Sequence, residues 1–189
     1  MNKIIILVIY CMLGTICASA QNIAEKFINM PDTILPYLFT QERKDLIELK
    51  KMEPDSTASV NAPLGKIEMI RLTDNILSLR LSEHNSLEMG MISPDTLYVI
   101  KTYGAPLQES VCTLYNNIWK KIRTFDFANT DFKDCSELIE FPLVSATIGN
   151  TPYELMLQLN IPLLTQEDKE KSKSKTMQRN VKWNGQTFN

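Results

Sequence analysis

Few residues of this 189-residue chain combine the types and the spacing that catalysis requires. The only histidine, His84, lies in a predicted turn between Glu83 and Asn85. A general base needs a partner that orients it, and a short exposed turn offers none. We therefore interpret His84 as a turn residue rather than as a catalytic base.

One group of acids lies close together in the sequence. Its members are Asp126, Asp131, Asp134, Glu137 and Glu140. A calcium loop of the EF-hand type needs oxygen ligands at alternate positions around a glycine, whereas these acids are mostly three apart with no glycine among them. We favour the solvated face of a turn and a short helix. A calcium site and the paired carboxylates of a hydrolase are the alternatives.

The motifs that bind nucleotides or activate nucleophiles are absent. The six glycines are too dispersed to form GxGxxG or a P-loop, and neither GxSxG nor HExxH occurs. No Cys/His spacing indicates a zinc site. We expect no cofactor and no metal, and we favour a non-enzymatic protein.

The first twenty residues resemble a secretory signal peptide. Lys3 precedes the apolar run 4–13, and Ala18-Ser19-Ala20 provides the small residues that signal peptidase requires. We predict cleavage after Ala20 and a mature domain of residues 21–189 without a transmembrane anchor, in the periplasm or outside the cell. Lipidation of Cys17 is less favoured because Ile16 before it is large.

The cysteines Cys112 and Cys135 lie outside this leader. An oxidising compartment favours a disulfide between them, which would contribute about 3 kcal/mol by closing a loop of a little over twenty residues. Two separate buried thiols are the alternative.

Charge and size exclude some functions. The whole chain has 20 basic and 22 acidic residues, and removal of Lys3 with the leader makes the balance slightly more acidic. No positive excess is present to drive binding to nucleic acid. The remaining 169 residues are enough for one domain with a substantial core.

The sequence predicts two helices, at residues 23–30 and from the N-cap Thr40 to Glu53. The period then changes from 3.6 to 2, which predicts five strands at 66–72, 76–82, 86–92, 96–103 and 109–116. Their connections are too short for crossover helices, so we expect an antiparallel meander. The fold class is α+β: a helix pair packed on the meander.

The C-terminal third predicts a hairpin of strands 143–148 and 153–161, a short helix from Thr165 and a final strand 177–183. The strand at 96–103 is apolar on both faces, so we expect a second layer or a partner over it. Several aromatic residues on or near strands are either core residues or anchors for a protein or glycan partner: Tyr98, Tyr103, Tyr115, Trp119, Tyr153 and Trp183.

The chain resembles a family of small secreted proteins of unknown function from Bacteroidetes (Bacteroidales). The resemblance rests on short sequences in the helical part and the meander: Met30-Pro31-Asp32, Leu35-Pro36, Arg43-Lys44-Asp45-Leu46-Ile47, Leu72-Thr73-Asp74, Leu77-Ser78-Leu79, Leu87-Glu88-Met89, and Tyr115 with Trp119. Before the first strand the family has two glycines where this chain has Pro63-Leu64-Gly65, and the match is weaker after Phe141. The resemblance implies an extracytoplasmic location and transfers no catalytic residues.

These observations favour an exported, non-catalytic binding or assembly module of the cell envelope with a protein or glycan partner. A carboxylate-dependent hydrolase acting on envelope polymers and a carrier of a small ligand are the alternatives.

Overall fold

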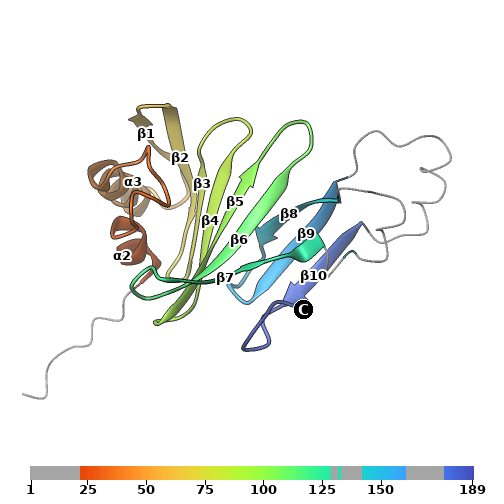
Figure 1. Cartoon of the computed structure of the whole chain (residues 1–189). Coiled ribbons are helices and arrows are strands. Elements are labelled where there is room, and N and C mark those ends of the chain that lie inside the picture. Colours follow the sequence, from red (N-terminus) through yellow and green to blue (C-terminus); the bar gives the residue numbers. More distant parts are fainter. Residues whose placement is uncertain (1–21, 129–131, 133–141, 161–176) are drawn as a thin grey trace, which may run out of the picture.

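Antiparallel strands make up most of the structure. The computed structural model describes residues 22–128, 132, 142–160 and 177–189. One sheet has seven strands in the order β1-β2-β3-β4-β5-β6-β7, and the other has three in the order β10-β9-β8 (Figure 1). The strands of the large sheet are β1 (Ala58–Ala62), β2 (Gly65–Leu72), β3 (Ile76–Arg80), β4 (Ser86–Ser93), β5 (Thr96–Tyr103), β6 (Glu109–Asn116) and β7 (Lys121–Phe125).

The predicted meander is confirmed, because β2 to β6 are the five expected strands and each pairs antiparallel with the next. The prediction missed the two edge strands. β1 consists of small and polar residues, and β7 is exposed along nearly its whole length. Alternation between apolar and polar residues requires one buried and one solvated face, and β7 is exposed on both faces.

Among the described residues, two helices accompany the ten strands. The helix α2 (Ile23–Ile28) has six residues, and the Asn22 side chain accepts a hydrogen bond from the Glu25 amide at its start, 3.0 Å away. The helix α3 (Thr40–Met52) has Phe39, not Thr40, as its N-cap and makes no side-chain cap there. The α+β class therefore fits only coarsely, since the protein is mainly antiparallel sheet.

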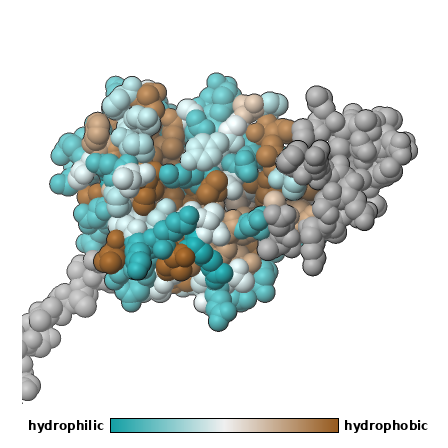
Figure 2. Space-filling view, viewed as in Figure 1, coloured by the Kyte–Doolittle hydropathy of each residue, from teal (hydrophilic) through white to brown (hydrophobic). Residues whose placement is uncertain are grey.

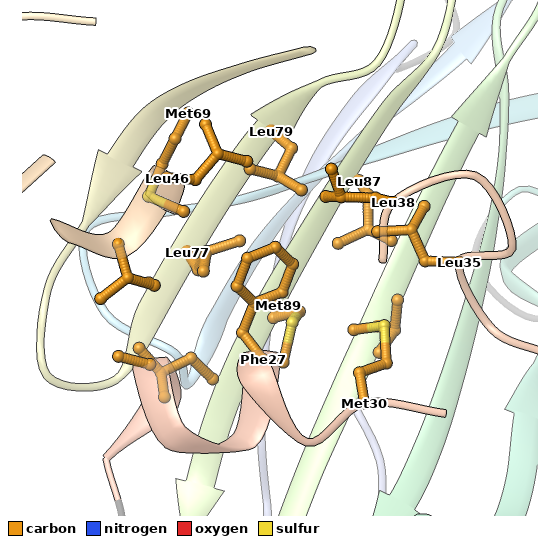
Figure 3. Close-up of a cluster of buried hydrophobic side chains, with 14 of the residues drawn as sticks. Phe27, Met30, Leu35, Leu38, Leu46, Met69, Leu77, Leu79, Leu87 and Met89 are labelled. Carbon is orange, nitrogen blue, oxygen red and sulfur yellow. The ribbon is translucent and has the colours of Figure 1, made fainter. Parts of the chain in front are cut away.

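One face of the large sheet forms a core with the helical segment. Figure 3 shows Phe27 of α2 against Leu77 and Met89, with Leu46 of α3 beside the sheet. The pairing aligns Met69, Leu79 and Leu87 in one row on this face. Burial of apolar surface, at about 25 cal/mol per Å², is the main stabilisation that the sheet gains from these contacts.

The opposite face is covered by the second sheet, which consists of β8 (Leu143–Ile148), β9 (Glu154–Asn160) and β10 (Gln178–Lys182). Its apolar side packs on Tyr98 and Ile100, while Leu97 and Val99 of the same strand face the helices. The two-sided apolar pattern of β5 thus follows from its place between two layers, and the expected second layer is part of this chain.

The C-terminal hairpin and final strand are confirmed by the pairings of β8 with β9 and of β9 with β10. After β10 the chain turns back, and Asn189 exchanges two backbone hydrogen bonds with Lys182. The helix predicted from Thr165 lies outside the described residues.

Candidate functional site

A groove of about 620 Å³ opens where the core beneath the helices reaches the surface. One wall is the connector, which we define as residues 29–39 between α2 and α3. The other walls come from the β1–β2 turn, from β2, from the β3–β4 turn and from the adjoining ends of β4 and β5. The volume lies within the range of about 300–1,000 Å³ that is common for small-molecule sites.

The lining of the groove is mostly apolar. The connector contributes Ile34, Leu35 and Pro36, and the strands and turns contribute Leu64, Ile67 and Leu81. Tyr37 and Tyr103 also line it and are about half exposed. The polar lining residues are Thr33, Ser82, Asn85, Ser86 and Lys101. Figure 2 shows apolar residues at the surface among hydrophilic ones, over the helices and the adjoining part of the large sheet.

A buried guanidinium holds the connector wall in place. Arg43, in the first turn of α3, is fully buried and donates to the Leu38 carbonyl at 2.8 Å and the Ile28 carbonyl at 3.2 Å. It also donates to the carbonyls of Phe27 and Met30 and pairs with Asp32. Phe27 and Ile28 lie at the end of α2, and Met30 and Leu38 lie near the two ends of the connector, so one side chain ties both ends of the connector to α3.

Lys101 lines the groove at the end of β5. In the β4–β5 register it pairs with Leu87, and it therefore lies on the same face as Leu79 and Leu87. Its Nζ donates to the backbone carbonyl of Ile34 in the connector. Burial of the half-buried amine lowers the pKa of Lys101 below its ordinary value. Among the residues that the structure describes, no carboxylate forms an ion pair with it.

The polar groups that line the groove are hydroxyls, one amide and one amine. Its described lining contains no aspartate, glutamate, histidine or cysteine. It therefore presents neither a general acid or base of those types nor a set of metal ligands. What it does present is an apolar surface with hydroxyl groups and one amine, which can hold a ligand with an apolar body and a polar end.

Glu88 is a carboxylate with a raised pKa, and it does not line the groove. Glu88 is largely buried, and burial raises its pKa. Its Oε1 accepts from the Ser78 hydroxyl and its Oε2 from the Ile148 amide, each at 2.9 Å. Arg71 donates to the Gly149 carbonyl at 2.8 Å nearby. Both oxygens of Glu88 therefore accept internal hydrogen bonds. The one from Ile148 joins β4 to the β8–β9 hairpin.

The other residues that the sequence singled out do not form a reactive centre within the described part of the chain. His84 lies in the exposed β3–β4 turn, with its Nε2 3.9 Å from Glu83 Oε2. Of the acidic group, only Asp126 is described; Asp131, Asp134, Glu137 and Glu140 lie outside the described residues. No group of three or more potential metal ligands occurs among the residues that were placed.

The disulfide stays a prediction. Cys112 lies on β6 in the core between the two sheets, and burial raises the pKa of its thiol. Its expected partner, Cys135, lies outside the described residues.

The aromatic residues divide into core and surface. Tyr98 is buried, and its hydroxyl donates to the Pro152 carbonyl at 2.9 Å. Tyr115 and Trp119 form an edge-to-face pair, and Trp183 packs against Phe125 and Phe188 in the same way. Tyr153 is about half exposed, and its hydroxyl donates to the Ile92 carbonyl at 3.0 Å. Of the six, only Tyr103 lines the groove.

Sequence reasoning missed Lys101, Tyr37 and Leu64 as lining residues. A signal for Lys101 was present, because it occupies a position of β5 whose neighbours on that face, Leu97 and Val99, are apolar. A lysine at such a position marks the point where a buried face meets solvent. No local signal distinguished Tyr37 or Leu64.

Comparisons with known proteins define the family but not an activity. No curated protein matches the chain. In the described part of the chain, no helix is long and apolar enough to cross a membrane. The fold is similar to that of a domain of an uncharacterized protein from Porphyromonas gingivalis W83, a member of the Bacteroidetes, with a TM-score of 0.69 and 16% identity over 88% of this chain and 96% of the other. The model of a family described as a protein of unknown function, DUF3256, matches residues 15–188. The chain therefore belongs to the DUF3256 family.

Proposed function

We propose that this protein is an exported, non-catalytic binding protein of the bacterial envelope that holds a small, largely apolar ligand in the groove. The observation that carries the proposal is the groove itself: about 620 Å³ bounded by apolar side chains from the connector and the sheet. Displacement of water from an apolar surface of this kind by a ligand is favourable.

The groove favours a small-ligand carrier over the other functions that the sequence suggested. A carboxylate-dependent hydrolase gains no support there, since no acid lies in its described lining. Glu88, the buried carboxylate with a raised pKa, has both oxygens in internal hydrogen bonds. A protein or glycan partner stays a prediction on which no contact in the structure bears.

Export is part of the proposal and rests on the leader described above. The P. gingivalis protein shows the fold alone and adds nothing on location. The direct test is N-terminal sequencing of the protein recovered from the envelope fraction of a producing cell. We expect the mature chain to begin at Gln21; an intact N-terminus in the cytoplasmic fraction would contradict export.

Binding is tested with N-phenylnaphthylamine, a neutral apolar probe that fluoresces when it leaves water. We expect saturable binding to the wild-type protein. Leu64→Asp should weaken it about ten-fold or more, because a carboxylate on the wall must lose water when the probe enters. Leu64 is 69% exposed, so the substitution should leave the fold intact.

A matched control separates the groove from general surface binding. Ile118 is 74% exposed in the β6–β7 turn and does not line the groove. Ile118→Asp adds the same charge and should leave probe affinity unchanged. The proposal fails if the wild-type protein does not bind the probe, or if Leu64→Asp and Ile118→Asp have equal effects.

A further inference from the structure

The position of Lys101 adds a charge to an otherwise uncharged groove. Among the described residues that line the groove, Lys101 is the only lysine, and there is no arginine, aspartate or glutamate. Across the sheet, Lys101 pairs with the buried Leu87 of β4 on one side and with the exposed Val111 of β6 on the other. The amine thus lies at the border between the apolar interior of the groove and solvent.

We infer that the ligand is an amphipathic carboxylate, whose acid group pairs with the Lys101 ammonium while its apolar chain lies against the aliphatic walls. The inference rests on the proposed function and specifies the class of ligand that the groove takes.

The hydrogen-bonding capacity of Lys101 supports this assignment. A lysine ammonium has three N–H donors and no acceptor. One donor is used by the Ile34 carbonyl, which also orients the amine towards the connector wall. Two donors remain, and a carboxylate with two oxygens is the acceptor that matches them in number and charge.

Electrostatics favours an anion over a neutral or cationic ligand. Burial without a described carboxylate partner disfavours the charged form of Lys101, which is why its pKa is lowered. A bound carboxylate would offset this loss of hydration and raise the pKa again. A cationic ligand would increase the charge at a place where charge is already disfavoured.

The experiment compares dodecanoate with dodecanol, which have chains of equal length and differ in the head group. Each is used below its aggregation limit to displace N-phenylnaphthylamine from the wild-type protein at neutral pH. We expect dodecanoate to bind about ten-fold or more tightly than dodecanol, as a charge-assisted hydrogen bond adds to the burial of the chain.

Two variants assign the preference to one residue. Lys101→Met should remove the preference for dodecanoate over dodecanol, whereas Lys101→Arg should retain it. Lys120→Met is the matched control, because Lys120 is exposed in the β6–β7 turn and does not line the groove. The comparison in the wild-type protein needs no variant, so a Lys101→Met protein that fails to fold does not end the test.

The outcomes separate the two proposals. Equal affinity for dodecanoate and dodecanol, or a preference that persists in folded Lys101→Met, overturns the assignment of the ligand and leaves the apolar binding site standing. Failure of both amphiphiles and of the neutral probe to bind overturns the proposed function together with the inference that rests on it.

Discussion

Replacement of Arg43 by methionine tests how the groove wall is held. The variant keeps a long apolar stem but removes every donor of the guanidinium. Arg43 is 0% exposed and donates to four backbone carbonyls, of Leu38, Phe27, Ile28 and Met30. These carbonyls belong to the end of α2 and to the connector, so the variant acts on the chain segment that bounds the groove.

The expected loss follows from what remains after the substitution. A buried acceptor left without its donor costs about 1–3 kcal/mol, and such costs do not add fully when the groups share one partner. In Arg43→Met, four backbone carbonyls lose the guanidinium as a donor together. We therefore expect Arg43→Met to lower the free energy of unfolding by about 4 kcal/mol, a large part of the total of about 5–15 kcal/mol for a domain.

The assay is urea unfolding followed by circular dichroism, with the slope of the transition compared between variants. Arg43→Lys keeps the charge but has a single donor group, and it should give an intermediate loss. Asp32→Asn is the control, because the Asp32 side chain is 62% exposed and an exposed ion pair contributes at most about 1 kcal/mol. A loss below about 1 kcal/mol in Arg43→Met would refute the assignment of Arg43 as the residue that holds the connector.

Three further outcomes are expected. Burial raises the pKa of Glu88 above its ordinary value of 4.5, so stability from this carboxyl is greatest below that pH and falls as the pH rises through the raised pKa. Glu88→Gln should therefore gain stability relative to wild type with increasing pH in urea unfolding; a constant difference would contradict this. Gly90→Ala should destabilise the protein by about 1–3 kcal/mol in thermal melting, since the new Cβ would lie 2.3 Å from Cζ of Tyr98; an unchanged melting temperature would show that the ring moves freely. A bridge between Cys112 and Cys135 should make the non-reduced protein migrate faster than the reduced one in a denaturing gel, and two titratable thiols would exclude it.

The central strands could be predicted because alternation is a local property. Successive side chains of a strand point to opposite faces, so Leu77 and Leu79 on one side and Ser78 on the other predict a strand without reference to the rest of the chain. The same logic shows that β5 is covered on both faces. It fails for β7, whose exposed residues carry no alternation of burial.

The meander, the C-terminal hairpin, the scarcity of catalytic motifs and the resemblance to a family of unknown function could all be recognised without a structure. Tertiary structure alone shows which layer covers each face of the sheet, because apolar alternation indicates only that a face is buried. The groove also depends on tertiary structure. The connector and the end of β5 meet there through the hydrogen bond of Lys101 with Ile34, which lie 67 residues apart in the chain. Contacts of that separation depend on how the whole sheet and both helices pack, and no local spacing encodes them.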